Sequence, residues 1–429
     1  MKKLVSIILT FAVLLSVCCI PAYAEETAGT TEKTYDIDGS YPYVFVHGMG
    51  AWGSYNKFNE TWPNWGGASG DGTDLIKIFN EAGIESYAAS VGPFNSAWDR
   101  ACELYAQLTG TVVDYGEAHS KAHNHERYGY TYENDQLMDE VWDLESKINL
   151  VGHSFGGPTV RLFVSLLAYG DEAEVAATGE DTSPLFTGGH DECINSCILL
   201  SSVNNGSPIA NLIADSDPIM TFIFTIANFA GYLIGDEVAM WRLQFTHFGL
   251  TNKQNGEKTT INPQFAKNLV ASKDHCGYDM TLRGAAELNE KIQLVPSVTY
   301  YSYTGRASKT TAVGTELPIS TMFTMFIPSS IYIGTLEGKT IDGITLDKNW
   351  AINDGIVPLA SALYPTDDAD KAFSYSETLA NGGEIERGNW YYMDIMEGFD
   401  HFDFSGTQDY PTSFEDFYFT MAETVKKHQ

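Results

Sequence analysis

Short apolar runs that end in turn-forming residues recur along the chain and predict buried β-strands. One run covers residues 43–46 and ends in His47 and Gly48, a second covers 148–151, and a third covers 198–203. Apolar runs of this length, bounded by turns, are typical of strands that are covered on both faces of a parallel sheet. A helix-compatible segment at 159–167 follows the second run. The pattern there predicts a strand, a turn and a helix.

The turn after the second run carries the most informative motif of the chain. Residues 152–156 are Gly-His-Ser-Phe-Gly, which matches the G-x-S-x-G pattern of a nucleophile elbow. In such an elbow the serine, here Ser154, occupies a strained turn, and the residues two before and two after it need almost no side chain. A plain glycine-rich turn can show the same pattern, but the flanking strand and helix favour a hydrolase. We therefore predict an α/β-hydrolase fold, in which helices flank a mostly parallel central sheet.

A serine nucleophile needs a general base and an acid that orients the base. In this fold they follow the serine in the order Asp or Glu, then His. His401 lies in a short polar interruption at 398–403, before the last helix-like segment, and is the predicted base. Asp354 lies in the Asn-Asp-Gly turn at 353–355 and is the predicted acid. Turn chemistry alone would make Asp354 an ordinary turn residue, but its position between the serine and the histidine favours a catalytic role.

The tetrahedral intermediate of ester hydrolysis also needs backbone N–H donors that face its oxyanion. One donor normally comes from the residue after the nucleophile, here Phe155, and the other from a loop that follows an early core strand. The run at 43–46 and its His-Gly turn supply such a loop, and the amide of Met49 is the predicted second donor. The alternative is that the His-Gly pair only ends the strand.

Composition and the first residues indicate an exported protein. Residues 1–24 contain Met-Lys-Lys, an apolar stretch at 4–17 and Ala-Tyr-Ala at 22–24, as in a signal peptide. The mature chain is expected to begin at Glu25, with a polar lead-in over 25–40. A lipoprotein signal at Cys18 is disfavoured because Val17 is large for the preceding position. The formal net charge of −31 argues against nucleic acid as a partner.

Two other features concern membranes and disulfides. Residues 219–234 form the most apolar stretch outside the signal peptide, yet they are short for a membrane span and contain Asn228 and Gly231. The stretch is a candidate surface for apolar contact with lipid, with a buried core helix or a membrane segment as alternatives. Cys193 and Cys197 are close enough in sequence to pair if the backbone allows it, but the cysteine pattern implies no disulfide framework.

Several further motifs resemble those of the staphylococcal and thermostable bacillary true lipases. The motifs recur in the family's order from about residue 41 to the C-terminus: Trp-Asp-Arg-Ala-Cys at 98–102, a histidine-rich loop around 119–125, Ser-Pro-Leu-Phe-x-Gly-Gly-His at 183–190, Tyr-Asp at 278–279 and Asn-Asp-Gly-Ile-Val at 353–357. The resemblance implies one α/β-hydrolase domain over 41–429. It also implies a zinc-binding insert around 97–130 and a mobile helical lid around 206–250.

The resemblance implies a metal site as well. In that family two aspartates and two histidines hold a structural zinc ion, and the matching positions here are Asp99, His119, His125 and Asp279. On spacing alone, histidines of such a polar loop would more often be solvated, and the resemblance leaves His123 as a bystander. Four nitrogen and oxygen ligands with no open position would make the zinc structural and not catalytic.

The family's calcium site uses two carboxylates that follow the catalytic histidine, together with backbone oxygens. Asp403 matches the first carboxylate, Asp409 matches the second only if one residue is inserted, and the carbonyl position falls near Pro318. Solvated carboxylates are the alternative to calcium. The chain also departs from the family at 204–208, where Asn-Asn-Gly-Ser-Pro replaces a Thr-Pro-His turn. The resemblance therefore does not give the shape of the acyl pocket.

Taken with the resemblance, the motifs predict an extracellular triacylglycerol lipase that hydrolyses lipid esters at an oil-water interface through a Ser-His-Asp acyl-enzyme mechanism. A broad-specificity carboxylesterase or polyester hydrolase of the same fold is one alternative. A non-catalytic, zinc-stabilised surface-binding protein is another, and a broken triad would indicate it. No transmembrane span is expected in the mature chain, and the oligomeric state is left open.

Overall fold

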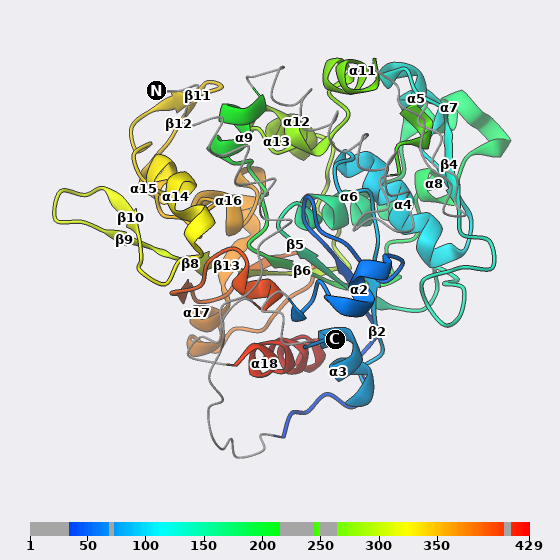
Figure 1. The fold of residues 1–429 in the computed structure, drawn as a ribbon. Helices are drawn as coiled ribbons and strands as arrows, with labels where there is room; N and C mark the ends of the chain where they lie inside the picture. The colour runs from blue at the N-terminus through cyan, green and yellow to red at the C-terminus, as the bar shows by residue number, and fades with distance from the viewer. Residues whose placement is uncertain (1–33, 68–72, 215–243, 249–263, 407–412) are drawn as a thin grey trace.

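A seven-stranded sheet forms the centre of the molecule. The computed structural model describes residues 34–67, 73–214, 244–248, 264–406 and 413–429. The strand order is β13-β14-β7-β6-β5-β1-β2, and all neighbouring strands are parallel (Figure 1). The strands are β1 (Tyr43–Val46), β2 (Ser86–Ala89), β5 (Ile148–His153), β6 (Ile194–Leu200), β7 (Thr299–Tyr303), β13 (Ala372–Ser374) and β14 (Trp390–Tyr392). The predicted α/β-hydrolase fold with a parallel central sheet is confirmed.

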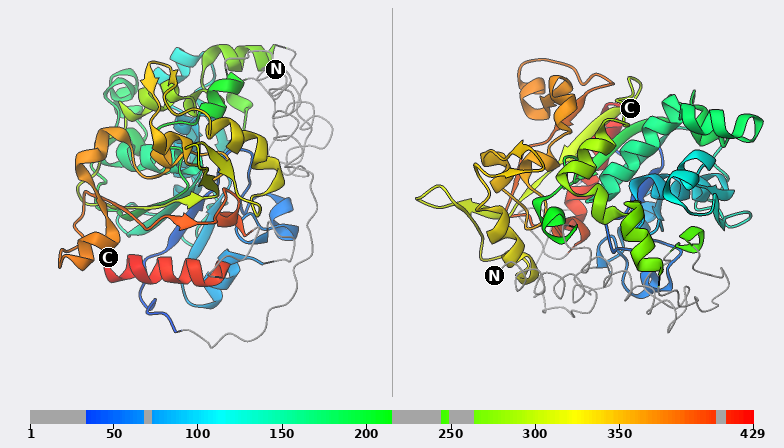
Figure 2. Two further views of the ribbon diagram at one scale, coloured as in Figure 1. Left: turned by 90° about the vertical axis from the view of Figure 1, so that its left-hand side faces the viewer. Right: turned by 90° about the horizontal axis from the view of Figure 1, so that it is seen from above.

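Both faces of this sheet are covered, which explains why its strands are apolar throughout. On one face Tyr43 and Phe45 of β1 pack with α3 (Leu75–Glu81) and α18 (Phe414–Lys427). On the other face Val44 and Val46 join a larger core with α4 (Ala97–Thr109) and α6 (Gly156–Tyr169). Figure 2 shows α18 on one side of the sheet and most of the other helices on the opposite side. Burial on two faces removes the polar alternation of a half-exposed strand.

The remaining elements surround this framework. Among the described residues, the other α-helices are α2 (Lys57–Thr61), α5 (Glu117–His123), α7 (Glu172–Thr178), α8 (Pro184–Thr187), α9 (Pro208–Ala214), α11 (Phe265–Ser272), α12 (Cys276–Asp279), α13 (Leu282–Asn289), α14 (Ile327–Ile333), α15 (Lys348–Ala351), α16 (Leu359–Ala362) and α17 (Tyr375–Ala380). Four small two-stranded sheets pair β3 (Val112–Asp114) with β4 (Tyr128–Thr131), β8 (Gly305–Arg306) with β15 (Met396–Glu397), β9 (Ser308–Thr310) with β10 (Glu316–Pro318), and β11 (Thr340–Ile341) with β12 (Ile344–Thr345). Within the described ranges, no helix is both long enough and apolar enough to cross a membrane.

Two boundaries differ from the sequence-based prediction. The predicted strand at 198–203 is β6, which begins at Ile194 and ends at Leu200, because Ser201 takes a left-handed φ of 40° that breaks the extended backbone. The predicted helix at 159–167 is α6, which already begins at Gly156. The helix therefore starts two residues after Ser154 and leaves only a tight turn between β5 and α6.

Candidate active site and metal cluster

Ser154 lies on the tight turn between β5 and α6. Its backbone φ is 55°, a left-handed value that a residue with a side chain seldom adopts, as expected at a nucleophile elbow. The neighbouring glycines are required by close packing. A Cβ on Gly156 would lie 2.2 Å from the carbonyl oxygen of Val46, and one on Gly48 would lie 2.8 Å from the Cβ of Ser154. The loop after β1 is thereby brought into contact with the serine.

The structure brings Ser154, His401 and Asp354 together in one buried chain of contacts. The Nε2 atom of His401 is 2.9 Å from the Oγ of Ser154, and its Nδ1 atom is 2.7 Å from the Oδ2 of Asp354. Because the carboxylate oxygen accepts, Nδ1 carries the hydrogen and Nε2 presents a lone pair to the serine hydroxyl. The three side chains come from the β5–α6 turn, from a turn before α16, and from a turn between β15 and a short 3-10 helix (Asp403–Ser405).

The environment of Asp354 favours its ionised form. Burial alone would raise the pKa of this carboxyl, but the His401 imidazole and the amides of Ile356 and Val357 more than offset it and hold the pKa below its usual value. Those two amides donate to Oδ1 at 2.9 and 2.7 Å, which leaves Oδ2 for the imidazole. The backbone amide of His401 also donates to the carbonyl of Asp354 at 2.9 Å. The acid and the base are therefore fixed to each other through backbone and side chain.

The two predicted oxyanion donors belong to the serine turn itself and to the loop that contacts it. Phe155 is the fully buried residue between Ser154 and α6, and Met49 follows Gly48 in the loop after β1. Within the described part of the chain, neither amide N–H donates a hydrogen bond to another residue. Amides without a partner are what an oxyanion hole needs, and the role of these two stays a prediction.

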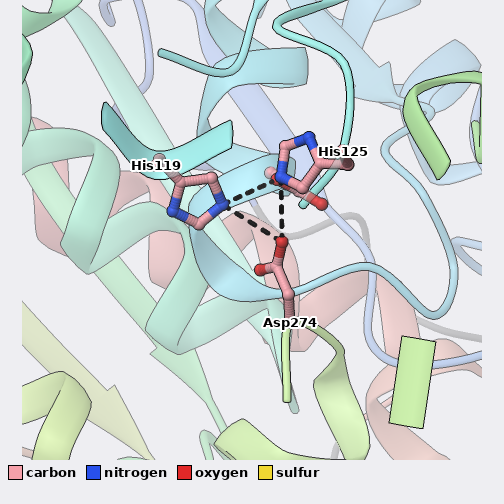
Figure 3. Close-up of side chains that lie close together, drawn as sticks. His119, His125 and Asp274 are labelled. Atoms are coloured by element: carbon pink, nitrogen blue, oxygen red, sulfur yellow. Dashed lines mark hydrogen bonds and ion pairs between the residues drawn. The ribbon is translucent and has the colours of Figure 1, made fainter. Parts of the chain in front are cut away.

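A second cluster of polar side chains joins the region of α4 and α5 to the segment before α12, and it differs from the predicted ligand set at one position. Asp99 on α4, His119 on α5, His125 in the loop after α5, and Asp274 before α12 each present one ligand atom, and these atoms all lie within 4.8 Å of one another. Figure 3 shows His119, His125 and Asp274 pointing toward one another. Among the described residues this is a group that could hold a metal ion, which confirms that the chain has a candidate metal site.

The contacts within this cluster suit a tetrahedral ion. The Nε2 of His119 is 3.4 Å from Asp99 Oδ1 and 3.1 Å from Asp274 Oδ2, and the Nε2 of His125 is 3.2 Å from Asp274 Oδ2. Ligand atoms about 2.0–2.1 Å from a tetrahedral ion would be about 3.3–3.4 Å apart. The Oδ1 of Asp99 and the Nε2 of His125 are also buried without a hydrogen-bond partner. An ion would satisfy both atoms.

Asp279, the predicted fourth ligand, lies outside this cluster. Its Oδ2 accepts a hydrogen bond from the amide of Ala97 at 2.7 Å, so it closes the N-terminus of α4. Burial raises the pKa of Asp279 to about 7, whereas in Asp274 the opposing effect of His119 outweighs burial and holds the pKa well below normal. Asp274, five positions earlier in the same segment, is therefore the carboxylate that faces the histidines. Asp279 was predicted from the resemblance, and Asp274 was not considered.

Sequence reasoning also missed His247. Its Nε2 lies 3.0 Å from the Oδ2 of Asp99, which leaves Oδ1 of that carboxylate directed into the cluster. Glu126 has a similar effect on His125, because its carbonyl accepts from Nδ1 at 2.8 Å and so leaves Nε2 to face the cluster. His123 contacts the carbonyl of Ser272 through Nδ1 at 3.0 Å and is not among the four clustered residues. Hydrogen bonds that orient a ligand side chain join residues at no fixed distance in the sequence, so a sequence motif does not predict them.

The other predicted sites are only partly described. Asp403 is buried, and its Oδ2 accepts from the amide of Asp400 at 2.7 Å, while Asp409 lies outside the described residues, so the calcium site stays a prediction. The apolar stretch at 219–234 also lies outside them, as do residues 1–33 with the predicted signal peptide. Cys193 and Cys197 are free and buried. Cys193 directly precedes strand β6 and Cys197 lies within it. Two cysteines four positions apart in an extended chain are too far from each other to form a disulfide.

The sheet topology and the nucleophile elbow define an α/β-hydrolase. The sequence profile of the family described as "Lipase-like, C-terminal domain" matches residues 39–428. The chain therefore belongs to this family of lipase-like C-terminal domains.

Individual relatives agree with this assignment. The chain is 34% identical over 372 residues to Lipase 2 of Staphylococcus aureus, which covers 85% of this chain and 50% of the relative. Among solved structures it resembles the lipase of Staphylococcus hyicus, with a TM-score of 0.75, 30% identity and coverage of 93% of this chain and 99% of that one. EstA from Clostridium botulinum gives a TM-score of 0.76, 31% identity and 97% coverage of both chains. The predicted resemblance to staphylococcal lipases is confirmed, and the chain spans about half the length of the curated relatives it matches.

Proposed function

We propose that this chain is a serine carboxylic ester hydrolase that acts on triacylglycerols. The observation that carries the proposal is the contact chain from Ser154 Oγ to His401 Nε2 and from His401 Nδ1 to Asp354 Oδ2, at 2.9 and 2.7 Å. Membership of a lipase-like family supports an ester as the substrate. The names of the staphylococcal relatives support a lipid ester.

The mechanism follows from these positions. Ser154 attacks the ester carbonyl while His401 accepts the hydroxyl proton, and Asp354 stabilises the imidazolium that forms. The amides of Met49 and Phe155 stabilise the oxyanion of the tetrahedral intermediate. His401 then protonates the leaving alcohol, and a water molecule deprotonated by the same imidazole releases the acyl group from Ser154.

The metal cluster has a separate, structural role in this proposal. Asp99, His119, His125 and Asp274 would hold a zinc ion, because two imidazole nitrogens and two carboxylate oxygens suit a closed tetrahedral zinc site. Bound zinc would supply a cross-link between α4, α5 and the segment before α12. Export is also part of the proposal, on the basis of the signal-like residues 1–24.

Hydrolysis of emulsified triolein, tributyrin and a soluble butyrate ester by wild type and Ser154→Ala tests the activity. A lipase should hydrolyse all three, and Ser154→Ala should hydrolyse none. Cleavage of only the short-chain substrates would replace the lipase by a carboxylesterase of the same fold. No cleavage by folded, zinc-loaded wild type would favour the non-catalytic alternative.

A further inference from the structure

Arg100, on helix α4, is a fully buried cation that the mechanism above does not use. It follows the metal-cluster residue Asp99 directly, and its side chain is 0% exposed. Within the described ranges no carboxylate oxygen lies within 4.0 Å of its guanidinium. Burying a charge without an opposite charge is costly unless its N–H groups find good acceptors. The hydrogen-bond acceptors of the Arg100 guanidinium therefore indicate what this buried cation does.

The guanidinium contacts both sides of the proposed oxyanion hole. One Nη2 hydrogen is donated to the carbonyl of His47, the residue before Gly48 and Met49. The Nε atom donates to Thr159 Oγ1 at 3.0 Å, and the Thr159 hydroxyl donates to the carbonyl of Phe155, also at 3.0 Å. The central carbon of the guanidinium lies 5.1 Å from the centroid of the Phe155 ring, within range of a cation–π contact.

A second set of contacts reaches the same loop from its other end. The Nη1 atom of Arg100 donates to the carbonyl of Gly92 at 3.3 Å, and the amide of Gly92 donates to Glu103 Oε2 at 2.5 Å. The next residue, Pro93, accepts a hydrogen bond from the amide of Gly50 at 2.9 Å. Met49 therefore lies between His47, which Arg100 holds directly, and Gly50, which Arg100 and Glu103 hold through the segment at 92–93.

We propose that Arg100 is a positioning residue, whose planar guanidinium holds the Met49 and Phe155 amides in register around Ser154. This inference rests on the proposed function, because it assumes that these amides stabilise an oxyanion. A fork of several fixed N–H donors can join three separate backbone segments, whereas a lysine ammonium on a flexible stem cannot reproduce that geometry. The substrate itself does not touch Arg100, so its loss should affect the transition state more than substrate binding.

Arg100→Met and Arg100→Lys, purified with zinc, test the proposal against the matched variant Arg161→Met. Arg161 is likewise a buried arginine, but it lies farther along α6, donates to Asn289 at 3.0 Å and lies over the Trp390 ring. With a soluble butyrate ester, Arg100→Met should lower kcat about 10- to 100-fold with little change in KM, since removing one oxyanion donor outright costs about 100- to 1,000-fold. Arg161→Met should change kcat less than about threefold while it is folded.

Binding of an alkylboronic acid supplies a readout other than turnover. The boron atom bonds to Ser154 Oγ, the hydroxyl proton passes to His401, and the anionic tetrahedral adduct mimics the intermediate, so boronate affinity should fall in proportion to kcat/KM in both Arg100 variants. If Arg100→Met fails to fold, Arg100→Lys carries the test, because it keeps the charge and loses only the fork. Unchanged boronate affinity in a folded Arg100 variant would overturn the proposal, as would an equal loss in Arg161→Met.

Two further controls separate the role of Arg100 from that of the metal cluster and from the proposed function. His125→Ala removes a metal ligand but leaves Arg100 in place, and an equal loss of boronate affinity in this variant would show that the effect comes from the metal cluster and would overturn the proposal. Ester hydrolysis by wild type that Ser154→Ala abolishes establishes the proposed function independently. A wild type without that activity would reject the proposed function, whereas an active wild type with indifferent Arg100 variants would reject only the role of Arg100.

Discussion

The imidazole of His153 donates a hydrogen bond from Nε2 to the backbone carbonyl of His401 at 2.9 Å, and the two rings lie 4.8 Å apart. Burial, together with the neighbouring His401, lowers the pKa of His153 to about 3, so this ring stays neutral at the pH values at which an ester hydrolase is assayed. The residue immediately before Ser154 thus anchors the backbone of the proposed base. The elbow and the histidine loop are joined by this bond as well as by the contact between Ser154 and His401.

We expect His153→Phe to lower kcat about 10-fold, because the ring is kept while the bond to the His401 carbonyl is lost and the base is less well fixed. His153→Gln retains an amide donor and should lose less. Steady-state kcat and KM on a soluble ester measure the effect. A His153→Phe variant with wild-type kcat would show that packing alone fixes the His401 loop.

Ser154→Ala and His401→Ala should each lower kcat by about 10⁴-fold or more, because the members of such a triad act as a unit. Circular dichroism should show both variants folded. A phosphonate ester that labels serine nucleophiles should react with wild type and fail to label Ser154→Ala. Turnover near that of wild type in either variant would reject the catalytic assignment.

The fold was predictable from the sequence because one local motif carries non-local information. Gly152, Ser154 and Gly156, placed between an apolar run and a helix-compatible segment, favour a turn in which a buried strand meets a helix, and that turn implies a sheet around it. The exact ends of β6 were not predictable, since apolar residues continue past Leu200 to Val203. The break there comes from the left-handed backbone of Ser201, which stands between two backbone hydrogen bonds that Leu200 and Val203 form with Ser154.

The metal cluster shows where sequence reasoning reached its limit. Asp99, His119 and His125 are placed by motifs that are local in sequence, and the structure brings them together. Asp274 and Asp279 are five positions apart at opposite ends of the short turn of α12, and only the packing of that turn against α4 decides which one faces the histidines. His247 comes from a distant segment without any spacing signal. The sequence placed Arg100 in the Trp-Asp-Arg-Ala-Cys motif but did not predict its contact with the loop at 47–50.

A matched pair of variants tests the corrected ligand set. Asp274→Asn should lose most of its bound zinc and lower Tm, because an amide is a poor ligand and the histidines would be left without their carboxylate. Asp279→Asn should retain about one zinc per chain, since its contact with the Ala97 amide needs only an acceptor oxygen. Elemental analysis of unstripped protein, with thermal melts, measures both. Zinc loss in Asp279→Asn with full retention in Asp274→Asn would restore the original assignment, and wild type without zinc would reject the zinc site.

The last prediction concerns the pH dependence of stability and rests on Glu103. This carboxyl is fully buried on α4, and burial raises its pKa to about 8 from an ordinary value of 4.5. Below pH 4.5 the carboxyl is protonated in both folded and unfolded states, so its contribution to stability is fully present. Between 4.5 and about 8 the folded protein keeps a proton that the unfolded chain has released, and this contribution is lost as the pH rises.

Glu103→Gln should therefore flatten the decline in unfolding free energy across this window. The difference in slope between wild type and variant should not exceed about 1.4 kcal/mol per pH unit, the value for one proton. The glutamine keeps one acceptor oxygen for Asn95 and Tyr115, so the slope and not the absolute stability is the quantity to compare. Urea unfolding of both proteins from pH 5 to 8, at one fixed zinc concentration, measures it. Parallel curves would show that Glu103 is ionised throughout, held as a carboxylate by the donors around it.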